Sequence, residues 1–113
     1  MTITPEILLR AYSMGIFPMA ESREAVEIHW VEPRFRGVFP INGFHISRTL
    51  RAQILHDDYS VTVDRDFVGV VGACADRATT WINGEITDLY QKLHDMGHAH
   101  SVEVWRGGSL IGG

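Results

Sequence analysis

Three histidines near the C-terminal end of the sequence carry side chains that can bind metal ions. His94, His98 and His100 lie close together, but the run passes from a predicted helix end into a predicted strand. No fourth ligand is obvious, whereas structural metal sites usually have four. Hydrogen bonding inside the fold is therefore the favoured role of each histidine, and a metal site is the alternative.

Glu103 is a carboxylate within the same predicted strand. It alternates with Val102 and Val104, which places it on the opposite face of the sheet with Ser101 and Trp105. A carboxylate beside an aromatic ring can serve as an acid, a base or an orienting group. A charge that faces solvent is the alternative, and the pattern leaves both open.

The sequence contains no self-contained catalytic motif. Cys74 is the only cysteine, so a disulfide within the chain is excluded, and its place on an apolar helix face is typical of an inert hydrophobic side chain. There is no Gly-x-Ser-x-Gly elbow and no phosphate-binding loop, because Gly107-Gly108 indicates a hairpin turn.

Residues 34–56 form one basic segment. They contain four arginines (Arg34, Arg36, Arg48 and Arg51) and no Asp or Glu. Since this segment carries +4 and the whole chain −4, the remainder carries −8. Such a segment can bind an anionic partner locally, and Arg48 and Arg51 share one helix face that suits phosphate contacts. From charge alone, a solvated arginine face is the simpler interpretation.

Two aromatic residues could line a pocket. Trp81 lies in a predicted linker between two helices, where an indole either fills the core or lines a pocket, and the core is favoured. Tyr90 lies on the apolar stripe of the following helix, where core packing is the default.

The N-terminal part must position these groups through a helix and short strands. Thr4 is predicted to cap a helix that starts at Pro5 and stops at Gly15. An apolar extended segment over 15–19 and a polar loop over 21–27 follow. Strands are predicted over 26–31 and 37–41, with a turn at Asn42-Gly43.

The remaining elements follow from caps and periodicity. Ser47 is predicted to cap a helix to about His56, and Asn83 a helix that Gly97 ends. A strand over 59–64 and a helix capped by Asp64 or Asp66 lie between them, and a hairpin follows over 101–111. The expected buried stripes are Ile46, Leu50 and Ile54 for the second helix, and Ile86, Leu89, Tyr90, Leu93 and Met96 for the last.

This order of elements predicts a mixed α/β or α+β sheet. The chain stops inside the returning strand of the hairpin, which would leave an open sheet edge, so we expect a fragment of a longer protein. No apolar run approaches the roughly 20 residues that span a bilayer, and residues 1–6 lack the features of a signal peptide. A cytoplasmic location is expected.

Four segments resemble the leucyl/phenylalanyl-tRNA–protein transferase family. They are Gly-Ile-Phe-Pro at 15–18, His-Ile-Ser-Arg at 45–48, Thr-Trp-Ile at 80–82 and Gly-His-Ala-His-Ser-Val-Glu-Val-Trp at 97–105. Their order and spacing match over nearly the whole chain, from about Ile7 to Gly113, and the last segment is long and specific.

The resemblance implies an aminoacyltransferase that takes Leu, Phe or Met from charged tRNA. It would transfer the amino acid to the N-terminal Arg or Lys of an acceptor protein, which marks that protein for degradation by the N-end rule. The charged tRNA is the donor, so no metal or organic cofactor is implied, and the full-length protein is expected to be a monomer with no membrane partner.

The resemblance also implies a fold and site residues. The fold is α+β: a small N-terminal domain over 1–31, then the incomplete first part of a GNAT-like (acetyltransferase-type) mixed sheet with helices over 32–113. Trp81 and Tyr90 match positions of the aminoacyl side-chain pocket, and Met19 stands where some relatives have tryptophan. Arg48 and Arg51 match basic positions near the tRNA acceptor stem.

One departure from the family pattern is large. In relatives the strand after the hairpin leads to a Phe-Phe-Gly-Glu-Ser-Met-Phe-Ser-like segment, and later to an Asp and a Gln that orient the acceptor amine. None occurs up to Gly113, so the catalytic residues are expected beyond it and this chain is expected to be inactive alone.

Two alternatives remain. One is a non-catalytic tRNA-binding or protein-interaction module. The other is an enzyme with a different acyl donor, such as acetyl-CoA, which would need a pyrophosphate-binding loop that opens a helix; none is recognised in the sequence.

Overall fold

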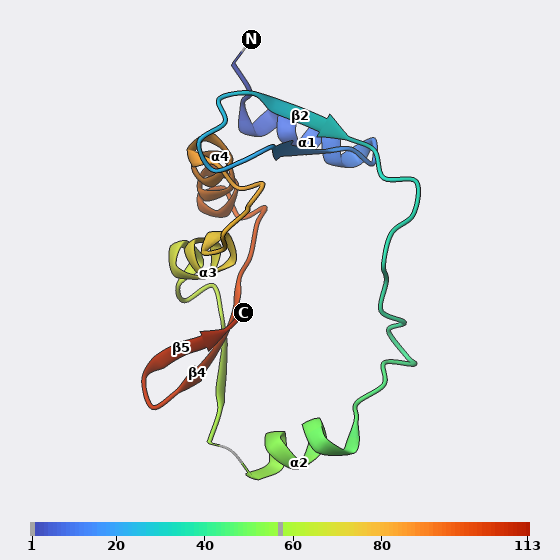
Figure 1. Ribbon diagram of the computed structural model, residues 1–113, viewed down its shortest axis with the longest axis vertical. Helices are drawn as coiled ribbons and strands as arrows, with labels where there is room; N and C mark the ends of the chain where they lie inside the picture. The colour runs from blue at the N-terminus through green and yellow to red at the C-terminus, as the bar shows by residue number, and fades with distance from the viewer. Residues whose placement is uncertain (1, 57) are drawn as a thin grey trace.

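A computed structural model describes residues 2–56 and 58–113 as an α+β fold (Figure 1). The elements in chain order are α1 (Pro5–Ser13), β1 (Phe17–Ala20), β2 (Ile28–Val31), α2 (Arg48–His56), β3 (Ser60–Val63), α3 (Phe67–Ala75), α4 (Gly84–Asp95), β4 (Val102–Arg106) and β5 (Ser109–Gly112). None of the described helices is long and apolar enough to cross a membrane.

Local capping determines where the helices begin and end. The Thr4 side chain accepts a hydrogen bond from the backbone N–H of Ile7, at 3.3 Å, at the start of α1. Asn83 accepts from the N–H of Ile86 at 2.9 Å at the start of α4. Gly15 and Gly97 follow these helices with φ of +80° and +82°, which confirms them as the predicted stops.

The cap of α3 lies directly against a glycine. Asp66 accepts a hydrogen bond from the N–H of Gly69 at 3.0 Å. A Cβ atom at Gly69 would lie 2.1 Å from the Asp66 carboxylate, closer than any real contact. A larger residue at position 69 would therefore require the Asp66 side chain to move.

Two antiparallel sheets flank the helices. In the first, β1 pairs with β2, with Phe17 opposite Val31 and Ala20 opposite Ile28. In the second, β4 lies between β3 and β5, with Val63 opposite Val102 and a register irregularity at Val104 and Trp105. Backbone and side-chain bonds join the first sheet to the segment before α4: Ala20 N donates to Trp81 O at 3.0 Å, and Asn83 Nδ2 donates to Ala25 O at 2.9 Å.

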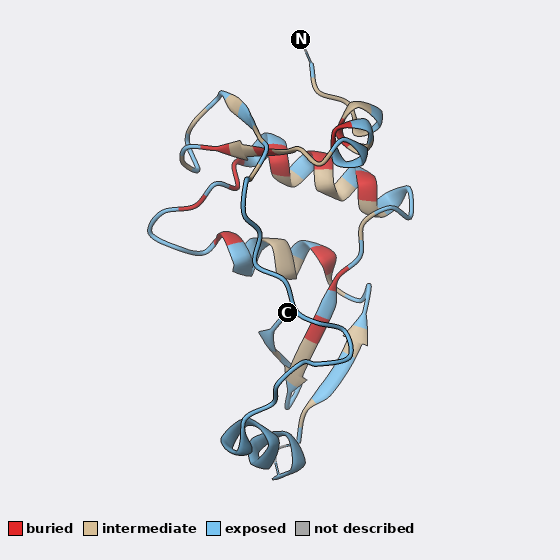
Figure 2. Cartoon of the chain, turned by 90° about the vertical axis from the view of Figure 1, so that its right-hand side faces the viewer, coloured by how far each residue is buried: buried red, intermediate tan, exposed pale blue. Residues whose placement is uncertain are grey.

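The core is small and gathers around α4. One cluster contains Ala20, Ala75, Ile82 and Ile86, and the other contains Leu8, Leu89 and Leu93. Tyr90 packs against both clusters. Figure 2 shows the buried residues around α1, α3 and α4, whereas the chain from residue 34 to the end of α2 is exposed throughout.

The segment from residue 34 to residue 56, called the arm below, departs from the predictions. The strand over 37–41 is wrong, because residues 36–40 have irregular structure and no strand pairs with them. Ser47 caps α2 as predicted, at 3.2 Å from Leu50 N, but the expected stripe is not buried. Ile46, Leu50 and Ile54 are 47%, 42% and 52% exposed, because nothing packs on that face. Met96, the C-cap residue that follows α4, is also exposed, at 45%.

The arm makes the molecule extended. Figure 1 shows it leaving β2, running away from α3 and α4, and returning through α2 into β3. The radius of gyration is 16.4 Å, against about 13 Å for a compact domain of this length.

Candidate functional site

Trp81 lines a cavity of about 550 Å³ between α3 and β5. Its side chain is 37% exposed, so the prediction that it fills the core is wrong. Ile82, the next residue, enters the core cluster with Ile86 instead, and this turns the indole toward the cavity. The other residues that line it are Val70, Ala73, Cys74, Arg77, Leu110, Ile111, Gly112 and Gly113.

Tyr90 lines a second cavity of about 590 Å³, whose wall is mainly apolar. Its hydroxyl is hydrogen-bonded to the hydroxyl of Tyr12, and the two rings meet edge to face with centroids 6.4 Å apart. Burial, together with the hydrogen bond to Tyr12, raises the pKa of Tyr90 far above its ordinary value. The phenol is therefore neutral at any physiological pH and offers one hydroxyl in an apolar wall.

The two cavities adjoin along α3. Val70, Cys74 and Gly113 line both, so the Trp81 and Tyr90 cavities share part of a wall. Met19 lines neither of them: it is half-buried in β1, opposite His29. The structure therefore places Trp81 and Tyr90 in two adjoining cavities, and Met19 apart from both.

Glu103 is fully buried and does not face solvent. Its carboxylate accepts hydrogen bonds from the Thr62 hydroxyl at 2.6 Å, from Arg65 N at 3.1 Å and from the Ser101 hydroxyl. Burial is the largest single influence and raises the pKa of Glu103, but these bonds together lower it below its ordinary value. The residue lines neither cavity, so it serves as an ionised anchor that ties β4 to β3 and to the turn before α3.

The histidines near the C-terminal end make hydrogen bonds within the fold. His100 Nδ1 donates to the Asp64 carboxylate at 2.7 Å, and His94 Nδ1 donates to Ala99 O at 2.8 Å while its ring stacks on Phe67. The bond from His100 is the main reason why the pKa of Asp64 lies below its ordinary value. The favoured structural role is thus confirmed for these two histidines.

The described part of the chain contains no preformed metal-binding site. No group of three or more His, Cys, Asp and Glu side chains in residues 2–56 and 58–113 is arranged to hold a metal ion. His98 lies instead at the second cavity.

Arg48 and Arg51 are both exposed on α2. Figure 1 shows α2 at the far end of the arm, apart from the α3 and α4 surfaces that line the cavities. The arrangement therefore separates the two cationic side chains from the Trp81 and Tyr90 region rather than joining them in one site.

Several contacts of the site could not be read from the sequence. Val70 and Leu110 line the Trp81 cavity, which depends on how β5 lies beside α3. Arg23 in the loop after β1 donates to Ala75 O at 2.7 Å and to Arg77 O at 3.0 Å, and so holds the end of α3. The sequence does not indicate these bonds, because an arginine in a polar loop can find its carbonyl partners only through tertiary contact.

Several curated proteins are similar to this chain. The leucyl/phenylalanyl-tRNA–protein transferase of Cereibacter sphaeroides is 61% identical over 111 residues, which cover 98% of this chain and 52% of that protein. Those of Ruegeria pomeroyi and a Jannaschia species are 58% and 56% identical, over 100% and 97% of this chain and 54% and 52% of their own lengths. The chain thus spans about half the length of the curated relatives that it matches.

Two family models divide the sequence between them. Residues 1–34 match the leucyl/phenylalanyl-tRNA protein transferase N-terminal domain, and residues 38–113 match the leucyl/phenylalanyl-tRNA protein transferase model itself. The matched residues include Trp81 and Tyr90 at the two cavities and both arginines of α2. Together with the similarity to the relatives, these matches show that the chain belongs to the leucyl/phenylalanyl-tRNA–protein transferase family of aminoacyltransferases.

Proposed function

We propose that this chain contributes part of the substrate sites of an enzyme that moves Leu, Phe or Met from charged tRNA to the N-terminal Arg or Lys of an acceptor protein. The modified protein would then enter the N-end rule degradation pathway of the cytoplasm. The observation that carries this proposal is that Trp81 and Tyr90 line adjoining, mainly apolar cavities that share Val70 and Cys74 of α3.

The cavities suit an apolar aminoacyl side chain. A pocket of 300–1,000 Å³ with mainly apolar walls is typical of small-ligand sites, and both cavities fall in that range. An apolar wall distinguishes apolar side chains that differ by a methylene by only about 1–3 kcal/mol. Such a pocket would accept Leu, Phe and Met together and reject charged side chains, which it could not solvate.

The arm would supply contacts to the tRNA. Arg48 and Arg51 are exposed and lie in a segment that has no carboxylate to neutralise them. Arginine side chains bind phosphate through paired hydrogen bonds, and the remaining −8 of charge would keep the rest of the surface away from the RNA backbone.

The reaction itself requires an amine nucleophile. The neutral α-amine of the acceptor attacks the ester carbonyl, a C–N bond forms, the C–O bond to the tRNA ribose breaks, and the amine proton passes to the leaving oxygen or to solvent. No metal or organic cofactor is needed, since the ester is already activated. The one fully buried carboxylate described here, Glu103, lines neither cavity and is not proposed as a base.

Transfer by this chain alone is not expected, because the groups that the resemblance assigns to orienting the amine are not among its residues. The division into a small domain over 1–31 and a GNAT-like domain from 32 belongs to the same proposal, as does a monomeric full-length protein. The alternative of a tRNA-binding module without activity predicts binding but no transfer in any context.

A transfer assay tests the proposal. The chain and a fusion of the chain to the unmatched part of the Cereibacter sphaeroides relative, hereafter the fusion, would each receive Phe-tRNA and an Arg-initiated peptide. We expect Phe transfer by the fusion and none by the chain. Transfer by the chain alone would contradict its expected inactivity, and a folded, tRNA-binding fusion without transfer would favour the binding module.

A further inference from the structure

The arm over residues 34–56 exposes an unusual number of large apolar side chains. Every residue in it is exposed. Nine of these residues are large and hydrophobic, with exposed fractions between 42% and 96%: Phe35, Val38, Phe39, Ile41, Phe44, Ile46, Leu50, Ile54 and Leu55. Single exposed apolar residues are ordinary, but a run of this length marks an interaction surface.

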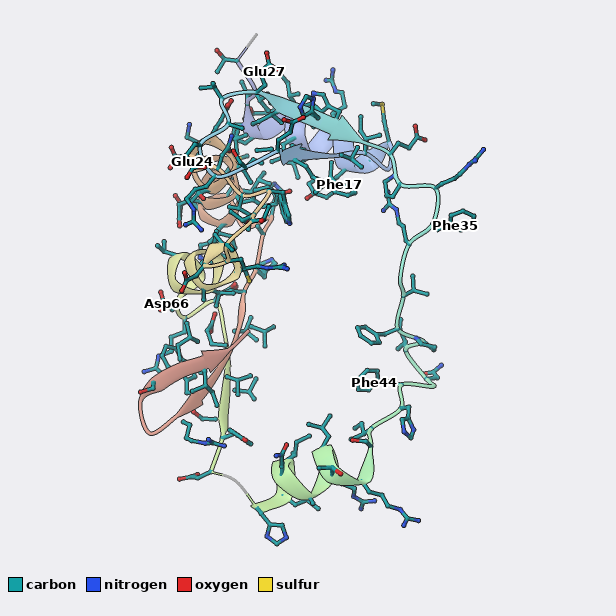
Figure 3. The ribbon with its side chains drawn as sticks, in the orientation of Figure 1. Phe17, Glu24, Glu27, Phe35, Phe44 and Asp66 are labelled. Carbon is teal, nitrogen blue, oxygen red and sulfur yellow. The ribbon has the colours of Figure 1, made fainter. Side chains whose placement is uncertain are left out.

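These side chains find little cover within the chain. Phe39 and Phe44 pack edge to face on each other, with centroids 5.1 Å apart. Figure 3 shows Phe35 and Phe44 standing out from the arm with no other element beside them. Since ordering an irregular segment costs conformational entropy, the arm needs a partner to offset that cost.

A second apolar surface lies on β3 and β4. Val61 and Val63 are 65% and 64% exposed, and Val102 beside them is 51% exposed. The register places Val63 opposite Val102 and Val61 opposite Val104, so these valines share one face of the sheet. β3 also lies at an edge of its sheet, and its outer backbone groups are not paired with a strand among the described residues.

The occupant can be inferred from the relatives. They match this chain through the whole arm, and nearly half of their length lies outside the match. Nine large apolar side chains of the arm are exposed, so the surface that covers them must itself be apolar, while Arg48 and Arg51 stay exposed for the tRNA. A second copy of the chain is the alternative occupant; among the described residues, its longest run of exposed apolar side chains is the same arm.

We propose that the arm and the exposed valine face of β3 and β4 form the docking surface for the part of the family fold that lies outside the matched region. The partner is thus a polypeptide segment with an apolar face. This inference rests on the family assignment and not on the transfer reaction, so its tests measure hydrogen exchange and thermal stability rather than enzyme activity.

Hydrogen exchange tests this directly, with the natural Cereibacter sphaeroides relative as the first sample. We expect the amides of its segment matched to residues 34–56 to exchange at least about tenfold more slowly than the arm of this chain alone, because docking buries them. Fast exchange of that segment in the folded relative would overturn the proposal. So would protection of the arm in this chain alone that grows with concentration, since that result assigns the surface to a second copy.

Matched variants of the fusion locate the surface. Ile41 in the arm and Val26 in the loop before β2 are 96% and 90% exposed in this chain. Ile41→Ser should lower the melting temperature of the fusion while Val26→Ser leaves it nearly unchanged, and neither should alter the unfolding of the chain alone. Equal effects of the two variants in the fusion would exclude the arm as the interface; if the fusion fails to fold, the exchange measurement on the natural relative decides.

Discussion

Tyr12 at the end of α1 and Tyr90 in the middle of α4 are joined through their hydroxyl groups, although 78 residues separate them in the sequence. Their rings meet at 88°. The pair connects the helix of the N-terminal region to the helix that lines the second cavity. Tyr12 is 46% exposed and Tyr90 is the more buried of the two. When the bond is removed, the Tyr12 hydroxyl can bond to water instead, whereas the Tyr90 hydroxyl is left without a partner.

Removing the Tyr12 hydroxyl should therefore lower the free energy of unfolding more than removing the Tyr90 hydroxyl. Tyr12→Phe leaves the Tyr90 hydroxyl in an apolar wall without its partner, and should cost about 1 kcal/mol in the free energy of unfolding. Tyr90→Phe leaves the Tyr12 hydroxyl to bond with water and should cost less. Urea unfolding of both variants and of the double variant measures this, and an equal or reversed order would show that the hydroxyl of Tyr90 has another partner.

Two glycines of α3 should respond in opposite directions to alanine. At Gly72 nothing lies within 4 Å of an added Cβ, so Gly72→Ala should stabilise the chain by about 0.5–1 kcal/mol through helix propensity. Gly69→Ala places its Cβ against the Asp66 carboxylate and should destabilise the chain despite the same gain in propensity. Thermal melts of the two variants compare them, and stabilisation by both would mean that the Asp66 cap moves away freely.

The two glycines also show which features the sequence could predict. Caps and stops, such as Thr4, Asn83 and Gly97, were predicted because each bond closes within a few residues of the cap. The clash at Gly69 is equally local, but it depends on the side-chain direction of Asp66, which spacing does not reveal. Helix periodicity also placed Leu89 correctly, since α4 has neighbours on the expected face.

The incorrect predictions concern segments whose structure depends on tertiary partners. The apolar residues of α2 have the spacing of one helix face, as predicted. Periodicity shows only which face a partner would cover, and not that the partner is present. The predicted strand over 37–41 failed for the same reason, because a strand needs a neighbour. The interpretation that Trp81 fills the core is wrong because adjacent linker residues compete for that place, and Ile82 occupies it.

The buried carboxylate of Glu103 should make stability depend on pH in the acid range. Its pKa is lower in the folded chain than the ordinary 4.5, so the stabilisation is present above about that pH and is lost as pH falls through the folded value. The urea midpoint should therefore fall below about pH 4.5. In Glu103→Gln the midpoint should be lower at neutral pH and the acid decline shallower.

Asp64 also has a lowered pKa and contributes to the same acid decline. Asp64→Asn is therefore a useful comparison, because asparagine tolerates the positive φ of 58° found at this position while it removes the charge. If Glu103→Gln leaves the slope of the acid limb unchanged while Asp64→Asn removes it, Glu103 is not the titrating anchor.

The two arginines of α2 should account for part of the salt dependence of tRNA binding. If each contacts one phosphate, the double variant Arg48→Ala/Arg51→Ala should weaken binding and reduce the slope of log K against log salt by about 1.5. Fluorescence titration of the fusion with tRNA at several salt concentrations measures the slope. Arg10→Ala removes one exposed charge from α1, outside the arm, and should leave the slope unchanged. A fall with Arg10→Ala half as large as that of the double variant would indicate only the loss of net charge.

Trp81 should contribute to recognition of the aminoacyl side chain, whereas Trp30 should not. Both indoles are 37% exposed, but Trp30 lies in β2 and lines neither cavity. Trp81→Ala in the fusion removes an apolar wall worth about 2 kcal/mol, which corresponds to about a thirtyfold fall in kcat/KM for Phe-tRNA. Trp30→Ala should change kcat/KM less than about twofold by the same reasoning. If the Trp81→Ala variant transfers Phe as well as the Trp30→Ala variant does, the Trp81 cavity is not the side-chain site, and the adjoining Tyr90 cavity becomes the candidate.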